Sequence, residues 1–131
     1  MASELRVNTL KDASGNNSVG MSYVAEGSAK AWCHCDMDGD DAFQQSFNFA
    51  SITDNGTGDY EFNFTNSMNY ADYAIGGNNG NDAKSTASTT QNRPAVSTSS
   101  AYKFTSLFND ASSAGAYDAD AISATIHGDL A

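Results

Sequence analysis

The fold is decided by residues 43–64, which read FQQSFNFASITDNGTGDYEFNF. Large aromatic side chains fall at alternate positions in both halves; they are Phe43, Phe47, Phe49, Tyr60, Phe62 and Phe64. A side-chain period of two is typical of a half-buried β-strand. Between the halves lies DNGTG (residues 54–58), and Asn-Gly between alternating runs is the strongest short hairpin signal. The stretch therefore predicts a β-hairpin whose aromatic side chains share one face at the centre of an all-β core.

Shorter alternating runs extend this pattern along the chain. They lie at residues 3–10, 19–24, 29–37, 70–75, 102–106 and 122–126, and a polar edge strand is predicted within 83–100, interrupted near Arg93 and Pro94. Residues 76–82 and 109–120 are predicted to be loops because turn-forming residues dominate them. No window shows the 3.6-residue apolar period of an amphipathic helix.

About eight short strands separated by turns predict a single-domain antiparallel β-sandwich, of the jelly-roll or immunoglobulin-like kind. A chain of 131 residues is long enough for one such core. Residues 1–12 are predicted to form an extended N-terminal arm or first strand, and residues 13–131 the sandwich.

The run at 29–37 divides its side chains between two faces. The expected core face carries Ala31, Cys33, Cys35 and Met37. Cysteines two positions apart on a strand are about 7 Å apart, which fits a disulfide poorly, so reduced thiols are expected. Trp32 lies on the opposite face, and a large aromatic side chain there indicates a surface for a partner.

The chain is acidic, with six Lys and Arg against sixteen Asp and Glu and a formal net charge of −10. This balance argues against nucleic acid, which needs a basic surface, and against anionic membranes. No apolar run of about eighteen residues is present, so membrane insertion is not expected. Neither a nucleophile elbow nor a phosphate loop occurs, and we expect no enzymatic activity. The many carboxylates leave a hydrolase of surface polysaccharide as a minor alternative.

One acidic turn is a candidate cation site. The sequence DMDGDD carries Asp36, Asp38, Asp40 and Asp41, whose oxygens are the ligands that Ca²⁺ prefers. An EF-hand loop also needs an acidic residue at position twelve, where this chain has Phe47, and flanking helices. The competing interpretation, a solvated β-turn without a cation, is the one that the sequence favours.

Several short motifs occur together in this chain. They are AKAW at 29–32, SFN at 46–48, SITDNGTGDY at 51–60, NFT at 63–65, a Tyr-bearing segment at 69–75, a closing strand at 122–128 and SELRVNTL at 3–10. This set resembles a module of virion structural proteins in tailed bacteriophages, common among marine phages and often the distal part of tail fibres. Cys33, Cys35 and the acidic turn at 38–41 depart from the neutral strand and Gly/Thr turn that are usual there.

The resemblance implies a homotrimeric virion component that is assembled in the bacterial host cytoplasm and has no catalytic residues. Because the chain is too short to include a fibre shaft, we expect a capsid decoration protein, head fibre or fibre tip on the particle exterior. Its partners would be its own copies and other virion proteins. The candidate interface residues are Leu5, Val7, Trp32, Tyr70 and Tyr73. The alternative is a receptor-binding tail-fibre module that recognises host surface glycans through exposed tyrosines and the loops at 78–82 and 110–120.

Overall fold

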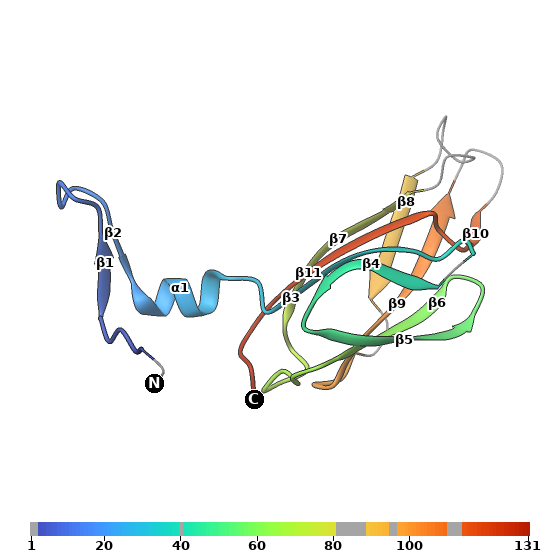
Figure 1. Cartoon of the computed structure of the whole chain (residues 1–131). Coiled ribbons are helices and arrows are strands. Elements are labelled where there is room, and N and C mark those ends of the chain that lie inside the picture. Colours follow the sequence, from blue (N-terminus) through green and yellow to red (C-terminus); the bar gives the residue numbers. More distant parts are fainter. Residues whose placement is uncertain (1–2, 40, 81–88, 95–96, 110–113) are drawn as a thin grey trace.

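Two antiparallel β-sheets pack against each other to form the body of the protein, and an N-terminal arm projects from one end (Figure 1). This computed structural model describes residues 3–39, 41–80, 89–94, 97–109 and 114–131. The predicted single-domain β-sandwich is confirmed.

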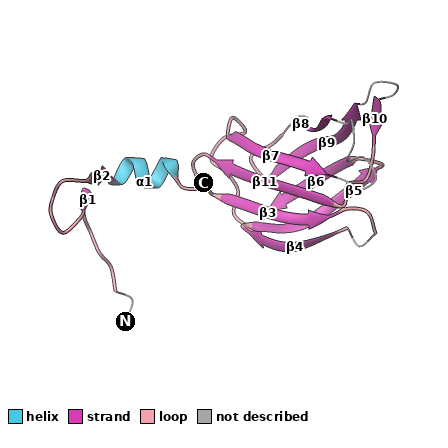
Figure 2. Ribbon diagram, turned by 90° about the horizontal axis from the view of Figure 1, so that it is seen from above, coloured by secondary structure: helices cyan, strands magenta, loops and turns pink. Residues whose placement is uncertain are grey.

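The first sheet, here called sheet I, has four strands in the order β4-β3-β11-β7 (Figure 2). They are β3 (Ala31–Asp36), β4 (Ala42–Phe47), β7 (Ala74–Gly80) and β11 (Ala121–His127). The two predicted faces of β3 are confirmed, because Ala31, Cys33, Cys35 and Met37 are buried while Trp32 faces outward. The predicted closing strand β11 lies in the middle of this sheet and contributes apolar side chains to the core.

The second sheet, sheet II, has five strands. Four of them follow the order β10-β9-β6-β5, and β8 pairs with the edge of β9 opposite to β6. They are β5 (Phe49–Gly56), β6 (Asp59–Phe64), β8 (Thr89–Pro94), β9 (Ala101–Asn109) and β10 (Ala114–Ala116). The polar edge strand predicted within 83–100 corresponds to β8, with Pro94 at its end, where an edge tolerates proline. Residues 81–88 and 95–96 of that predicted stretch lie outside the described residues. The loop predicted at 109–120 contains the short strand β10.

The predicted hairpin is formed by β5 and β6, but its turn comes later than the Asn-Gly pair. Gly56 pairs with the first residue of β6, so Thr57 and Gly58 make the turn, and the register shifts between Asp54 and Gly56. Gly58 has a φ of +70°, which suits glycine. The Asp54 carboxylate accepts a hydrogen bond from the Gly56 N–H at 2.8 Å and so supports the bulge before the turn.

Asp118 fastens this turn to the neighbouring strands. Its Oδ1 accepts hydrogen bonds from the Gly58 N–H at 2.8 Å and from the hydroxyl of Tyr60. The N–H of Ser106 on β9 donates to the carbonyl oxygen of Gly58 at 2.7 Å. Burial, together with the hydrogen bond to Asp118, raises the pKa of Tyr60 above its ordinary value. The turn is therefore held from two sides.

The chain passes from sheet I to sheet II at Asn48, between β4 and β5. Asn48 has a φ of +59°, a conformation that asparagine tolerates better than most residues. Its side-chain Nδ2 donates to the carbonyl oxygens of Lys30 and Asn66, each at 3.0 Å, and its Oδ1 accepts from the Asn66 N–H at 2.7 Å. The Asn48 side chain thus connects the β4–β5 connection to the residue before β3 and to the segment that follows β6.

Phe47 does not join the aromatic face that was predicted for it. The pairing of β3 with β4 shifts in register, which makes Gln44 an extra residue and inverts the alternation along β4. Phe43 consequently packs against Phe49 in the core, with ring centroids 5.5 Å apart, whereas Phe47 is 52% exposed.

The core is built from aromatic rings of both sheets around Phe62. Its ring centroid lies 4.8 Å from that of Phe104 and 5.1 Å from that of Phe43, both in edge-to-face geometry. Phe43 belongs to sheet I and the other two rings to sheet II. Each such pair contributes about 0.5–1.5 kcal/mol beyond the burial of apolar area. The predicted aromatic centre is confirmed, with Phe62 joining the two layers.

The strand predicted at 70–75 and the loop predicted at 76–82 are both wrong over most of their length. Strand β7 instead runs from Ala74 to Gly80 and pairs along its whole length with β11. The sequence predicted a loop here because glycine and asparagine, which favour turns, make up most of this strand. Asn79 is buried and donates to Ser106 Oγ at 2.5 Å, a long-range hydrogen bond that fixes the strand across the sandwich.

The arm comprises a short hairpin, β1 (Thr9–Lys11) and β2 (Ser18–Gly20), followed by helix α1 (Met21–Gly27). Figures 1 and 2 show it projecting away from the sandwich. The strand predicted at 19–24 is wrong beyond Gly20, where the helix begins; this helix is too short to display an apolar period. The boundary predicted after residue 12 falls in the hairpin turn, and sheet I begins at Ala31.

Candidate functional site

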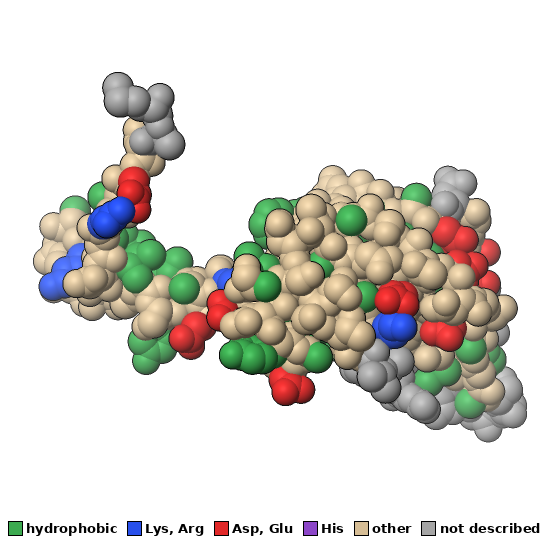
Figure 3. Space-filling model, turned by 90° about the horizontal axis from the view of Figure 1, so that it is seen from below, with side chains coloured by type: hydrophobic (Ala, Val, Ile, Leu, Met, Phe, Trp, Pro, Cys, Tyr) green, Lys and Arg blue, Asp and Glu red, His purple; other side chains and the backbone are tan. Residues whose placement is uncertain are grey.

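The arm exposes a series of apolar side chains. They are Leu5, Val7, Leu10, Val19, Tyr23 and Val24. Leu5 is 80% exposed, Tyr23 is 76% exposed, and helix α1 buries none of its residues. Hydrophobic side chains are visible along the arm in Figure 3. Apolar surface of this extent is typical of a segment that meets a partner.

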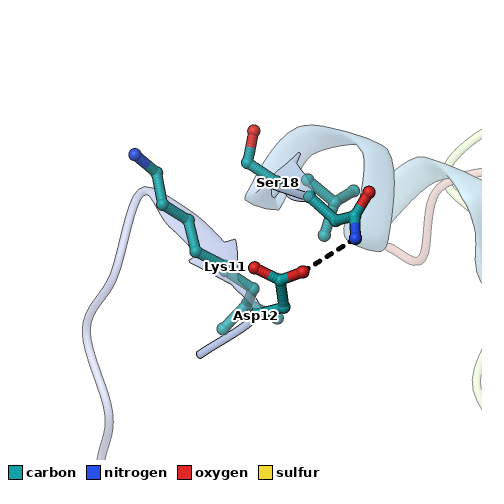
Figure 4. Close-up of a pocket in the computed structure, with 6 residues that line it drawn as sticks. Lys11, Asp12 and Ser18 are labelled. Atoms are coloured by element: carbon teal, nitrogen blue, oxygen red, sulfur yellow. Dashed lines mark hydrogen bonds between the residues drawn. The ribbon is translucent and has the colours of Figure 1, made fainter. Parts of the chain in front are cut away.

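Asp12 orders the turn of the arm's hairpin. Its carboxylate accepts a hydrogen bond from Asn17 Nδ2 at 2.7 Å (Figure 4). It also accepts one from the Asn16 N–H at 3.0 Å. The hydrogen bond from the Asn17 side chain holds the pKa of Asp12 below its ordinary value. The hollow beside this turn is lined by Leu10, Lys11, Asp12, Asn17, Ser18 and Val19. The turn is thus ordered by local polar contacts, while the apolar side chains beside it stay uncovered.

Lys30 joins the arm to the sandwich. Its backbone N–H donates to the carbonyl oxygen of Ile126 at 2.7 Å, and its ammonium group donates to the carbonyl oxygens of Ala25 and Ser28 at the end of α1. A cation at a helix C-terminus also interacts favourably with the helix dipole. The arm therefore leaves the body at a defined point, the start of β3.

The outward face of sheet I is the second candidate surface. The strand register arranges its residues in rows. The first row is Phe47, Trp32, Thr125 and Gly76, the second is Gln45, His34, Ser123 and Asn78, and both cross all four strands. The third row consists of the pairs Ala42–Asp36 and Ala121–Gly80. We call the second set the polar row. At roughly 4.8 Å between strands it spans about 14 Å.

Trp32 and Phe47 form an outward aromatic pair on this face. They lie directly opposite each other on β3 and β4, and they are 40% and 52% exposed. The outward position of Trp32 follows from the sequence alternation. That of Phe47 was missed because the bulge at Gln44 depends on the pairing of two strands, and the local sequence carries no signal for it.

Glycines keep the β7 side of this face open. A hollow lies there, lined by Gly77, Asn78, Gly80, Ala121, Ser123 and Thr125. A Cβ at Gly80 would meet no heavy atom within 4 Å, and one at Gly76 would meet only Thr125 Oγ1, at 3.8 Å. Neither residue has a positive φ. The chain's own packing therefore does not require glycine at these two positions.

The predicted calcium ligands are not assembled into a site by the described residues. Asp36 Oδ1 accepts a hydrogen bond from the Asp38 N–H at 2.9 Å, and the negative charge of Asp120 raises the pKa of Asp38. Asp40 lies outside the described residues, and Asp41 is exposed. Over the described ranges, no three His, Cys, Asp or Glu side chains are placed to hold a metal ion.

The remaining predicted interface residues divide into exposed and buried positions. Tyr70 is 68% exposed, as an interface residue needs to be. Tyr73 is a correction, because its ring packs edge-to-face on Phe64 and its hydroxyl donates to the carbonyl oxygen of Ala101 at 2.9 Å. Both ends of Tyr73 have partners within the chain, so it is unavailable to a neighbouring subunit.

The loops proposed for glycan recognition are only partly described. In the first, Asn78 lies on the outward face of β7 while Asn79 points into the sandwich, and residues 81–82 lie outside the described residues. In the second, Asp118 binds the hairpin turn, and residues 110–113 lie outside the described residues.

Cys33 and Cys35 are both free thiols buried on the inner face of β3. The hydrogen bond with Cys33, followed by burial, raises the pKa of Cys35 above its ordinary value. These thiols belong to the core and do not contribute to an exposed reactive site.

Comparison with known proteins adds no relative from which a role can be carried over. Within the described residues, no helix has both the length and the apolar character to cross a membrane. No protein-family model matches the chain, and neither a curated protein nor a solved structure matches it.

Proposed function

We propose that this chain is a structural subunit of a bacteriophage particle, a capsid decoration, head-fibre or fibre-tip protein that assembles through its N-terminal arm. The observation that carries the proposal is the uncovered arm. The phage context and the homotrimer rest on the motif resemblance described above.

The arm has too little internal packing to be stable by itself. Its strands are three residues long, its helix has seven residues, and none of the helical residues is buried. Isolated helices shorter than about 12–15 residues are marginal in water, and a lone two-stranded hairpin is at best marginally stable. A partner that covers Leu5, Val7 and Leu10 would supply the missing apolar burial, at about 25 cal/mol per Å².

Charge favours the arm over the sandwich as the contact between copies. Residues 1–28 contain two basic and three acidic side chains, a net charge of −1, which leaves −9 of the total −10 for residues 29–131. Several acidic side chains gather at the end of the sandwich away from the arm (Figure 3). Sandwiches that carry this charge repel one another, whereas a nearly neutral arm approaches an acidic neighbour with little electrostatic cost.

The test is to compare the mass in solution of the wild-type chain with that of the variant Leu5→Ser, Val7→Ser, Leu10→Ser. We expect a trimer for the wild type and a monomer for the variant at micromolar concentration. The variant should keep the folded sandwich by circular dichroism, because these side chains lie outside its core; its Tm should fall only by the contribution that association makes to the trimer. Antibody labelling of purified phage particles should place the wild-type chain on the particle exterior and should be lost for the variant.

A matched control removes an exposed apolar side chain from the body that is not a candidate interface residue, with Leu130→Ser. This control should stay trimeric and should still enter particles. A wild-type chain that is monomeric, or an arm variant that assembles like the wild type, would overturn the proposed role of the arm.

A further inference from the structure

The outward face of sheet I contrasts in charge with the rest of this acidic chain. In its three rows of four residues, Asp36 is the one carboxylate and neither Lys nor Arg occurs. Asp36 is engaged with the Asp38 N–H and lies in the outermost row, next to the β3–β4 turn. A strongly charged ligand would find no opposite charge along the aromatic pair and the polar row, so this face suits an uncharged ligand.

The polar row makes an apolar partner equally unsuitable. Gln45, Ser123 and Asn78 carry amide and hydroxyl groups that need hydrogen-bond partners, and His34 adds a ring nitrogen. His34 Nδ1 and Ser123 Oγ lie 3.1 Å apart and satisfy part of each other's capacity. Covering the row with an apolar surface would leave the remaining groups unpaired, which costs free energy. The ligand must therefore offer many neutral donors and acceptors.

The aromatic pair adds a second requirement. Trp32 and Phe47 border the polar row directly, since they occupy the adjacent positions on the same two strands. A ligand that meets both must present apolar C–H surface beside hydroxyl groups, and a pyranose ring does so because its C–H bonds gather on its flat faces. Glycine within a strand often marks the close approach of a ligand, and Gly76 and Gly80 have no packing reason within the chain.

We infer that the outward face of sheet I binds a neutral carbohydrate, with a sugar ring stacked on Trp32 and Phe47 and its hydroxyl groups hydrogen-bonded to the polar row. This surface differs from the tyrosines and loops that the sequence suggested for glycan recognition. The inference does not depend on the arm, because the rows belong to the sandwich alone.

The chain carries its own probe for this site, since Trp32 is its single tryptophan. The experiment titrates the full-length chain with neutral glucose, galactose and mannose oligosaccharides and follows tryptophan emission. Trp32→Ala removes this signal, so the variants are compared by isothermal titration calorimetry. We expect one class of oligosaccharide to bind, and Trp32→Ala to weaken binding roughly tenfold or more, as truncation of a tryptophan anchor does.

Three further variants make the test specific. Asn78→Ala should weaken binding about two- to tenfold, the loss expected for one hydrogen bond. Gly76→Val should fold, because the space above Gly76 is open, and should weaken binding by filling that space. Tyr23→Ala, which removes an exposed aromatic ring from the arm, should bind like the wild type.

Two results would overturn the inference. One is an absence of binding by the wild type to every oligosaccharide at millimolar concentration, and the other is equal binding by Trp32→Ala and the wild type. A monomeric arm variant that still binds the sugar supports this site, so failure of the assembly proposal is distinguishable from failure of this one.

Discussion

Replacing Gly58 with alanine tests the packing of the β5–β6 turn most directly. A Cβ at this position would lie 2.7 Å from the carbonyl oxygen of Ser106, and 2.9 Å and 3.0 Å from the backbone N and O of Tyr117. All three atoms belong to the backbone, so rotation of a side chain cannot relieve the overlap. The turn would have to move away from its neighbours.

The expected loss of stability has three parts. A left-handed backbone costs alanine roughly 1–2 kcal/mol. Moving the turn breaks the bond from the Gly58 N–H to the Asp118 carboxylate, worth about 1.5–3 kcal/mol, and the bond from the Ser106 N–H, worth about 0.5–1.5 kcal/mol. The free energy of unfolding should therefore fall by about 3–6.5 kcal/mol, against a total of roughly 5–15 kcal/mol for a typical domain.

Urea unfolding followed by circular dichroism measures this loss, and two other glycines separate its causes. Gly56 has a φ of +125°, which is more strained for alanine than the +70° of Gly58, but open space at its Cβ position, so Gly56→Ala should show backbone strain without steric overlap. Gly80 has neither constraint, and Gly80→Ala should change the free energy of unfolding by less than about 1 kcal/mol. A Gly58→Ala variant that loses no more than about 1–2 kcal/mol, the cost of the left-handed backbone alone, would refute the close approach on which this reasoning depends.

Three further predictions concern buried and acidic groups. Asp118→Ala should lower the free energy of unfolding by about 2–4 kcal/mol in urea, because it removes the acceptor of a turn N–H and of a tyrosine hydroxyl. The charge of Asp120 raises the pKa of Asp38 above 3.8, so protonation of Asp38 stabilises the fold at low pH and this contribution is lost as pH rises through the raised value. Asp38→Asn should consequently be at least as stable as the wild type at pH 7 in thermal unfolding, and lower stability there contradicts the interpretation. Cys33 and Cys35 should resist iodoacetamide in the native protein and react in urea, and rapid native labelling followed by mass spectrometry would contradict their burial.

Alternation predicted those strands that bury one whole face. The inner residues of β3 lie where the pattern placed them, and Tyr60, Phe62 and Phe64 on β6 are all buried. A strand with one buried face must place every second side chain inward, so the local sequence carries the information. The same argument located β9 and β11.

The remaining features depend on contacts between distant segments. Strand β7 is stabilised by its pairing with β11 and by the Asn79–Ser106 hydrogen bond, both contacts between distant segments. Its local sequence, rich in glycine and asparagine, is typical of a loop and therefore predicted one. The outward turn of Phe47 follows from a register shift against β3. The polar row could not be predicted because its four members come from four strands, and only the register aligns them.

The position of β3 determines how the molecule bears tension. The arm enters the sandwich at Ala31, whose strand lies between β4 and β11, and the chain leaves sheet I at His127 at the same end (Figure 2). Hydrogen bonds between antiparallel strands run perpendicular to the strands. A pull on the arm along β3 therefore applies a shear force to the hydrogen bonds of β3 with both β4 and β11. Many bonds must then break together, whereas an edge strand would peel away one bond at a time. A pull on the arm against the body of the sandwich would therefore meet the resistance of both strand pairings of β3 at once.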